Sequence, residues 1–389
     1  MRKQTGDFPL PASLIIMLTL LSTVLTGCWS KYELTERGFV MGVALDETKD
    51  GKIEMLTQIY RPASVETGKS ATTQTSSVSI RTHDDTVMEA IRDIPIHLGR
   101  KAQWSHTRII IVGEKLARNQ DLGKTLDIFY RDHEPRSSVK LLISKGPAHK
   151  MLEKQPLIEQ TTAQQILRTE EFSYLNAAKT MDTTLLSLLL QRESAHPDAV
   201  LSYVYNEASP EESMSTAGLA LIKDGKLKKI MPPDKVEGLL MLRNDYHSGV
   251  LETPCSGMKG EKETAEVLSL QTAMTTKIHD GRPQVSFHIK GELAITELKC
   301  SSIISFEDEQ KFIEKFSAAI VRQTGGTLRF LQKNKLEVIG IGNQLYRQSP
   351  KEWLKLQQDW DEQFAQLPIE VKAELKLVTG GTINSRPSS

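Results

Sequence analysis

The sequence has no surplus of charge of either sign. Its 389 residues include 49 basic and 49 acidic side chains, and no long block of like charge interrupts the mixture. A nucleic-acid-binding surface or a polybasic membrane surface needs such a block. We therefore expect no nucleic-acid partner.

Common catalytic and cofactor signatures are also missing. The sequence contains no G-x-S-x-G, P-loop, H-E-x-x-H or C-x-x-C motif, and its nine histidines form no pair at helical ligand spacing. Gly340-Ile341-Gly342 begins like a dinucleotide fingerprint, but Leu345 replaces the third glycine, so a turn or the start of a helix is the better interpretation. We expect a protein that is not an enzyme, with no catalytic residue, no cofactor and no metal.

Long hydrophobic runs are scarce, and the clearest one lies near the N-terminus. Arg2 and Lys3 precede about a dozen mostly apolar residues at 14–25. A membrane-spanning helix needs about 20 such residues, so the run is too short to span a bilayer. Its length and its basic flank predict a signal peptide over residues 1–27.

The run ends in Leu25-Thr26-Gly27-Cys28, which fits a bacterial lipoprotein signal. We expect a signal peptidase to cut between Gly27 and Cys28, and Cys28 to carry an S-diacylglycerol and an N-acyl group. One acyl chain holds a protein only marginally on a membrane, whereas two or more hold it stably. An ordinary signal peptide with an incidental cysteine is the alternative.

Cysteine is otherwise sparse. With Cys28 assigned to lipid, only Cys255 and Cys300 remain. A location outside the cytoplasm permits a disulfide, but two cysteines do not form a disulfide framework. Free thiols are the favoured interpretation and a pair stays possible.

Residue patterning indicates several folded regions after a polar tether at 28–37. Trp29 in this tether would rest at the lipid headgroups or pack on the folded body. Residues 38–45 and 53–60 predict a hairpin around a turn at 46–52. The Ser- and Thr-rich passage 63–79 predicts a mobile loop, with a partner-contact loop as the alternative.

The rest of the chain alternates between strand and helix patterns. Asp84 or Asp85 would cap the first helix, and Pro95 would kink or end it. Further strands are expected at 105–113, 139–144, 199–205, 217–222, 227–230, 265–278, 284–296 and 369–378. Helices are expected at 84–98, 122–130, 157–167, 183–192, after 232–234, at 307–332 and at 350–364.

A polar, proline-containing stretch at 206–213 suggests a domain boundary. We expect an N-terminal α/β region at 38–205, with subdomains of about 38–150 and 151–205. A C-terminal α+β domain at 214–380 and a tail at 381–389 would follow.

Taken together in chain order, these residues resemble the GerC-type spore germination lipoproteins, the C subunits of nutrient germinant receptors. Ser30 departs from the acidic residue that often follows the tryptophan, and the glycine-rich motif near residue 340 differs at two positions. The matching motifs are Trp29, Glu33-Leu34, Gly42-Val43 and Leu45-Asp46, Ser105-His106 to Gly113-Glu114, Leu126-Asp127 to Arg131-Asp132 and Arg136, Gly218-Leu219-Ala220, Glu337 to Gly342, and Pro350 with Trp353.

The resemblance implies an α+β fold of three consecutive mixed α/β domains with mostly antiparallel or mixed sheets. It also implies a lipid-anchored subunit on the outer face of the inner spore membrane. Two integral membrane subunits would be its partners, and the complex would trigger germination in response to nutrients. A solute-binding lipoprotein of a transporter and an envelope hydrolase are the competing hypotheses, although repeated βαβ lobes and nucleophile signals are missing.

Overall fold

The computed structural model describes residues 17, 36–61, 76–207, 213–279 and 281–379. The predicted signal peptide, the cleavage pair Gly27 and Cys28, Trp29, nearly all of the 63–79 passage and the tail fall outside these residues. Among the described residues, no helix is long and apolar enough to cross a membrane.

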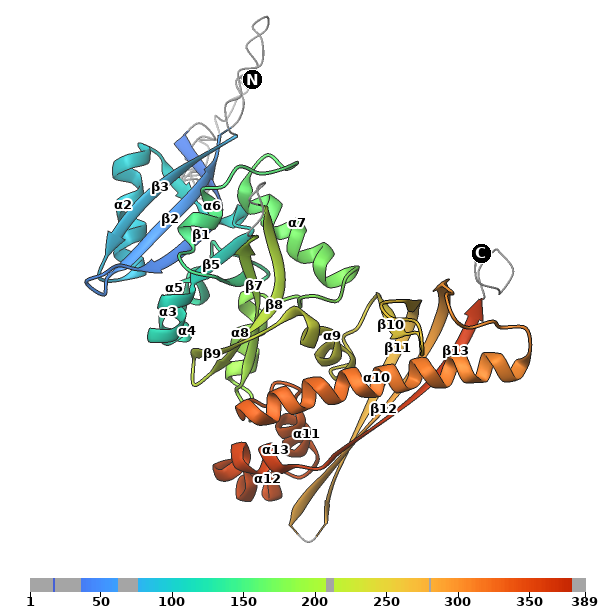
Figure 1. The fold of residues 1–389 in the computed structure, drawn as a ribbon. Coiled ribbons are helices and arrows are strands. Elements are labelled where there is room, and N and C mark those ends of the chain that lie inside the picture. The colour runs from blue at the N-terminus through green and yellow to red at the C-terminus, as the bar shows by residue number, and fades with distance from the viewer. Residues whose placement is uncertain (1–16, 18–35, 62–75, 208–212, 280, 380–389) are drawn as a thin grey trace, which may run out of the picture.

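The first of two sheets has nine strands in the order β3-β2-β1-β5-β6-β7-β8-β9, with β4 pairing with β1 (Figure 1). Strands β1, β5, β6 and β7 are parallel to their neighbours in this series, and the flanking pairs are antiparallel. The bounds are β1 (Arg37–Glu47), β2 (Ile53–Tyr60), β3 (Ser77–Asp84), β4 (Lys101–Gln103), β5 (Ile109–Gly113), β6 (Lys140–Ser144), β7 (Ala199–Asn206), β8 (Met214–Lys223) and β9 (Lys226–Met231).

Helices cover both faces of this sheet, as the uninterrupted apolar runs of β5 and β6 require. One face packs against α2 (Val87–Leu98), α3 (Glu114–Asn119), α4 (Leu122–Thr125), α5 (Asp127–Arg131) and α8 (Leu185–Arg192). The other face packs against α6 (His149–Leu152) and α7 (Thr162–Leu175). Helix α7 lies so close to β1 that a Cβ on Gly42 would be 2.7 Å from the Cβ of Ala163.

The second sheet has the order β10-β11-β12-β13 and carries a long twisted hairpin. Strands β11 and β12 are 18 and 16 residues long, and β13 runs parallel to β12. The bounds are β10 (Gly249–Pro254), β11 (Lys262–His279), β12 (Arg282–Glu297) and β13 (Ile369–Thr379).

Helices α9 and α10 connect this sheet to the first one. Helix α10 is 29 residues long and begins at a capping box between Ser305 and Asp308. Its buried face packs with β12 and with Trp353, Trp360 and Phe364 in one core. The bounds are α9 (Pro233–Leu242), α10 (Phe306–Asn334), α11 (Ile341–Gln348), α12 (Pro350–Leu356) and α13 (Trp360–Gln366).

The predicted α+β class with mixed sheets is confirmed. Several local expectations were wrong. Thr86 caps α2 in place of the expected Asp84 or Asp85; the helix ends at Leu98 as expected, so Pro95 lies inside it and does not end it. The helix expected from 157 begins at Thr162, and the helix expected at 350–364 is interrupted by a 3-10 turn at Gln357–Asp359. Strands β3, β4 and β10 were not expected at all.

The expected boundary at 206–213 lies between β7 and β8, which pair in antiparallel fashion within one sheet. The division into domains stays a prediction.

Candidate functional site

The segment after α10 places a buried carboxylate at the start of another helix. Oε1 of Glu337 accepts hydrogen bonds from the backbone N–H groups of Ile339, Gly340 and Ile341, and Oε2 accepts one from Gly342, at 2.7 to 3.1 Å. Gly340 has a φ of 104°, which favours glycine. The N-terminus of α11 carries partial positive charge, so this carboxylate occupies the place where an anion would bind.

This geometry explains why Gly340-Ile341-Gly342 is not a dinucleotide site. Gly342 packs so tightly that an added Cβ would lie 2.6 Å from the ring of Trp353. The helix N-terminus is already filled by the chain's own carboxylate. The interpretation as the start of a helix is confirmed.

A histidine from the first sheet's connections meets this segment. His196 lies between α8 and β7, with Nε2 3.4 Å from Oδ2 of Asp198 and 3.9 Å from Oε2 of Glu337. Its backbone N–H donates to Oδ1 of Asn343 at 2.9 Å. Burial disfavours the charged imidazole, but Asp198 and Glu337 outweigh this effect and raise the pKa of His196 above its ordinary value. The cluster therefore links the loop before β7 of the first sheet to the segment around α11, which packs with the second sheet.

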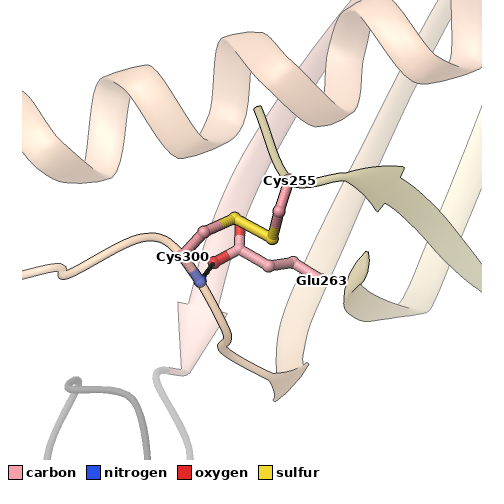
Figure 2. A group of neighbouring side chains, drawn as sticks. All are labelled: Cys255, Glu263 and Cys300. Atoms are coloured by element: carbon pink, nitrogen blue, oxygen red, sulfur yellow. Dashed lines mark hydrogen bonds between the residues drawn. A yellow bond between two sulfur atoms is a disulfide. The ribbon is translucent and has the colours of Figure 1, made fainter. Parts of the chain in front are cut away.

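The two remaining cysteines form a disulfide, contrary to the favoured expectation of free thiols. Cys255 follows β10 and Cys300 follows β12, and their Cα atoms lie 5.8 Å apart, which is ordinary disulfide geometry. Figure 2 shows Glu263 of β11 pointing at the same loop. Because both sulfur atoms are bonded to each other, this cluster does not offer the thiolates that a metal site would need.

Glu263 fixes the loop around Cys300. Its Oε1 accepts from the backbone N–H groups of residues 299, 300 and 301, at 3.2, 2.8 and 2.5 Å. Its Oε2 accepts from Ser301 and from Nζ of Lys315, both at 2.7 Å. Burial alone would raise the pKa of Glu263, but Lys315, Ser301 and the backbone donors lower it to about 2.

A third polar cluster joins β1, β2 and α6. Asp46 accepts from the backbone N–H groups of Ala148 and His149, at 2.7 and 2.9 Å, and so caps the short helix. Nδ1 of His149 lies 2.9 Å from Asp46 and 3.0 Å from Oε1 of Glu54. Gly113 leaves the space for Asp46, since an added Cβ would be 2.0 Å from Oδ1. These side chains bind one another and the backbone of α6, so the cluster links β1 and β2 to α6.

Burial raises the pKa of Glu170 to about 7, against the lowering effect of Lys140, whose Nζ lies 3.0 Å away. A carboxyl group with such a pKa is a candidate acid or base. Glu170 has no exposed surface, however, and it also accepts from the hydroxyl of Ser202 at 3.2 Å. It cannot reach a substrate without local opening of the fold.

Sequence reasoning found none of these clusters, because each joins residues far apart in the chain. The site that it did predict, Cys28 with Gly27, lies outside the described residues and stays a prediction. The fold and the clusters define a two-sheet α+β protein whose buried charges connect its parts.

Comparisons with known proteins agree with that class. Residues 30–205 match a family model described as the spore germination protein N-terminal domain, and residues 217–381 match one described as spore germination B3/GerAC like, C-terminal. The chain belongs to this family of spore germination proteins. The resemblance to the GerC-type proteins is confirmed.

Relatives from Bacillus subtilis strain 168 match along nearly their whole length. Spore germination protein KC is 25% identical over 96% of this chain and 97% of its own length. Spore germination protein B3 is 25% identical over 96% and 99%. The crystal structure of the GerBC protein has a TM-score of 0.55 at 22% identity, covering 87% of this chain and 97% of that one. The last match shows a common fold.

Proposed function

We propose that this chain is a non-enzymatic, lipid-anchored subunit of a nutrient germinant receptor. It would act with two integral membrane subunits on the outer face of the inner spore membrane and trigger germination. The observation that carries the proposal is the pair of family matches, which together cover residues 30–205 and 217–381 and leave little of the chain unassigned.

The described structure supports this role through what its buried charges do. The Glu337, Glu263 and Asp46 carboxylates all bind the chain's own backbone N–H groups. Groups committed in this way stabilise the fold, and they are poorly placed to attack a substrate. The lipid anchor would confine that surface to two dimensions and raise its effective concentration near membrane partners.

The anchor has a direct test. Cys28→Ala should leave the protein unprocessed or release it from membranes, whereas Thr26→Ala keeps Leu25, Gly27 and Cys28 and should be processed and retained. Both are measured by fractionation and by mass spectrometry of the mature N-terminus. Retention of a cleaved, unlipidated Cys28→Ala protein would contradict the lipid claim.

The receptor role is tested by deletion. A strain that lacks the gene, in a background without other germinant receptors, should sporulate normally and fail to germinate with particular nutrients. Re-expression of the wild-type chain should restore the response, and the Cys28→Ala variant should restore less of it. A deletion strain that answers every nutrient normally would refute the role.

A further inference from the structure

The connection between α6 and α7 presents two aliphatic side chains to solvent. In this loop, residues 153–161, Leu157 is 73% exposed and Ile158 is 91% exposed. The loop is held in shape from within. Oε1 of Gln165 accepts from the backbone N–H groups of Ile158 and Glu159, at 3.1 and 3.4 Å, and the hydroxyl of Thr162 donates to the carbonyl of Lys154 at 2.5 Å. Among the described residues, Ile158 is the most exposed large hydrophobic side chain.

The two ends of the loop are bound to strands β1 and β2 of the first sheet. Nε2 of Gln58 donates to the carbonyl of Leu152 at 3.2 Å, and its Oε1 accepts from the backbone N–H of Ala163 at 2.9 Å. Gly42 of β1 lies directly under Leu152 and Ala163. Gly42 is five residues beyond the start of β1, or about 17 Å along the strand. Figure 1 shows the loop between α6 and α7 at the same end of the sheet as the start of β1.

Chain length limits how far this end can be from the proposed anchor. Arg37, the first residue of β1, is nine positions after Cys28, and a fully extended chain of nine steps spans at most about 32 Å. If Cys28 is lipidated, Arg37 lies within that distance of the bilayer, and Gly42 at the base of the loop lies within about 49 Å of it.

The size of the apolar feature favours lipid over a protein partner. A stable protein interface buries about 800 Å² on each side, far more than two aliphatic side chains provide. Insertion at the headgroup boundary needs only a few apolar side chains when a lipid anchor already supplies most of the affinity. The loop's charged side chains do not favour an anionic surface, since Glu153 and Glu159 outnumber Lys154, and Glu153 pairs with Arg81 at 2.5 Å, so the aliphatic pair alone would supply the contact.

We propose that Leu157 and Ile158 insert into the headgroup boundary of the phospholipid bilayer next to the Cys28 anchor. This inference rests on the lipid anchor of the proposed function. A single anchor leaves the folded body free to rotate about its tether. A second contact from the 153–161 loop fixes which faces of the two sheets point away from the membrane and toward partner subunits.

The cysteine arrangement makes the test simple. In the lipidated protein Cys28 is blocked, and Cys255 is paired with Cys300. An Ile158→Cys variant therefore has one free thiol, which is labelled with an environment-sensitive fluorophore. Phe306→Cys is the matched control, because Phe306 is 75% exposed at the start of α10 in the second part of the molecule.

The purified lipidated variants are placed on vesicles of phosphatidylglycerol and phosphatidylethanolamine, with and without brominated lipids and without other subunits. We expect strong quenching of the label at 158 by brominated lipids and none at 306. Adding Leu157→Asp to the labelled Ile158→Cys variant should lower the equilibrium constant for insertion of the loop, obtained from the quenched and unquenched fractions, about tenfold, because burying one aliphatic side chain contributes about that factor.

Each outcome decides a different claim. If the protein floats with the vesicles and the labels at 158 and 306 are equally unquenched, the loop does not touch lipid and the inference is wrong while the anchor stands. If the lipidated protein does not float with vesicles, the anchor itself fails, and the inference falls with it. Equal quenching at both positions would mean that the label inserts by itself, which also overturns the inference.

Discussion

Removing the Cys255–Cys300 disulfide should lower the free energy of unfolding of the region that contains the second sheet and helix α10 by about 4 kcal/mol. The cross-link closes a segment of 45 residues, and in the chain-entropy account a loop of that length restricts the unfolded state by about this amount. The variant is Cys255→Ser with Cys300→Ser. Lys299→Ser, at an exposed neighbouring position, is the control and should change stability by less than about 0.5 kcal/mol.

The native loop should survive the loss of the disulfide. Glu263 holds the loop around Cys300 through the hydrogen bonds to residues 299–301 and through Lys315, independently of the sulfur atoms. The disulfide then acts mainly on the unfolded chain and Glu263 on the folded one. Because Glu263 binds the backbone N–H of Cys300, and Lys315 contacts both Glu263 and the Cys300 sulfur, Glu263→Gln and the cysteine variant should couple, with an interaction energy of about 0.5 kcal/mol or more.

Tryptophan fluorescence during urea unfolding gives a local readout. Trp353 and Trp360 both lie in the core of the second part, whereas Trp104 lies in the core of the first. The cysteine variant should shift the unfolding signal from Trp353 and Trp360 to lower urea without changing the native spectrum. A loss below about 1 kcal/mol, or an altered native spectrum, would refute the division of labour between Glu263 and the disulfide.

Three further predictions concern the other clusters and the acid response. The pKa of Glu263 is about 2 in the folded state and 4.5 in the unfolded state. Its stabilising contribution is therefore complete above about pH 4.5 and is lost as the pH falls toward 2. The stability of Glu263→Gln should lack this pH-dependent component during acid unfolding. His196→Ala should cost about 1 to 3 kcal/mol in chemical denaturation, because Asp198 and Glu337 lose the neighbouring imidazole while Lys223 stays 3.9 Å from Asp198. The raised pKa of His196 places this stabilisation below about pH 6.5, and it declines as the pH rises through the folded pKa, so a flat wild-type stability curve between pH 6 and 9 would contradict it. Gly113→Ala should lower the melting temperature by several degrees because its Cβ displaces Asp46, whereas Gly326→Ala, in helix α10 with only Nζ of Lys235 at 3.8 Å from an added Cβ, should not lower it.

The spacing of apolar residues in the sequence predicted the elements that have a regular apolar face. The hairpin of β1 and β2 and the long helix α10 fall close to where alternation and amphipathicity put them. Strand β3 was missed because its first residues fall in the Ser- and Thr-rich passage 63–79, although Val78 and Ile80 alternate with polar residues; the strand forms by pairing with β2. The loop at 157–161 was read as helix because Leu157 and Ile158 continue an apolar pattern, although nothing buries them.

The clusters were beyond sequence reasoning for a different reason. His196 and Glu337 meet only because the two sheets pack together, and no spacing in the chain records that contact. The cysteines were too few to imply a bond, and it is the ends of β10 and β12, brought together by pairing with β11, that place them side by side. The resemblance to the germination family rests on the order of short motifs along the chain, so it could be recognised without knowing which residues touch in the fold.

Helix α10 also has a mechanical consequence. Near its beginning Lys315 is tied to Glu263 beside the disulfide, and at its end the carbonyl of Lys335 accepts from Nζ of Lys223 in β8 at 3.2 Å. A helix of 29 residues is about 43 Å long and stiff, so a tilt of about 5° at one end displaces the other by about 4 Å. A movement of the second sheet that tilts α10 would therefore displace the contact between Lys335 and Lys223 in the first sheet by several ångströms.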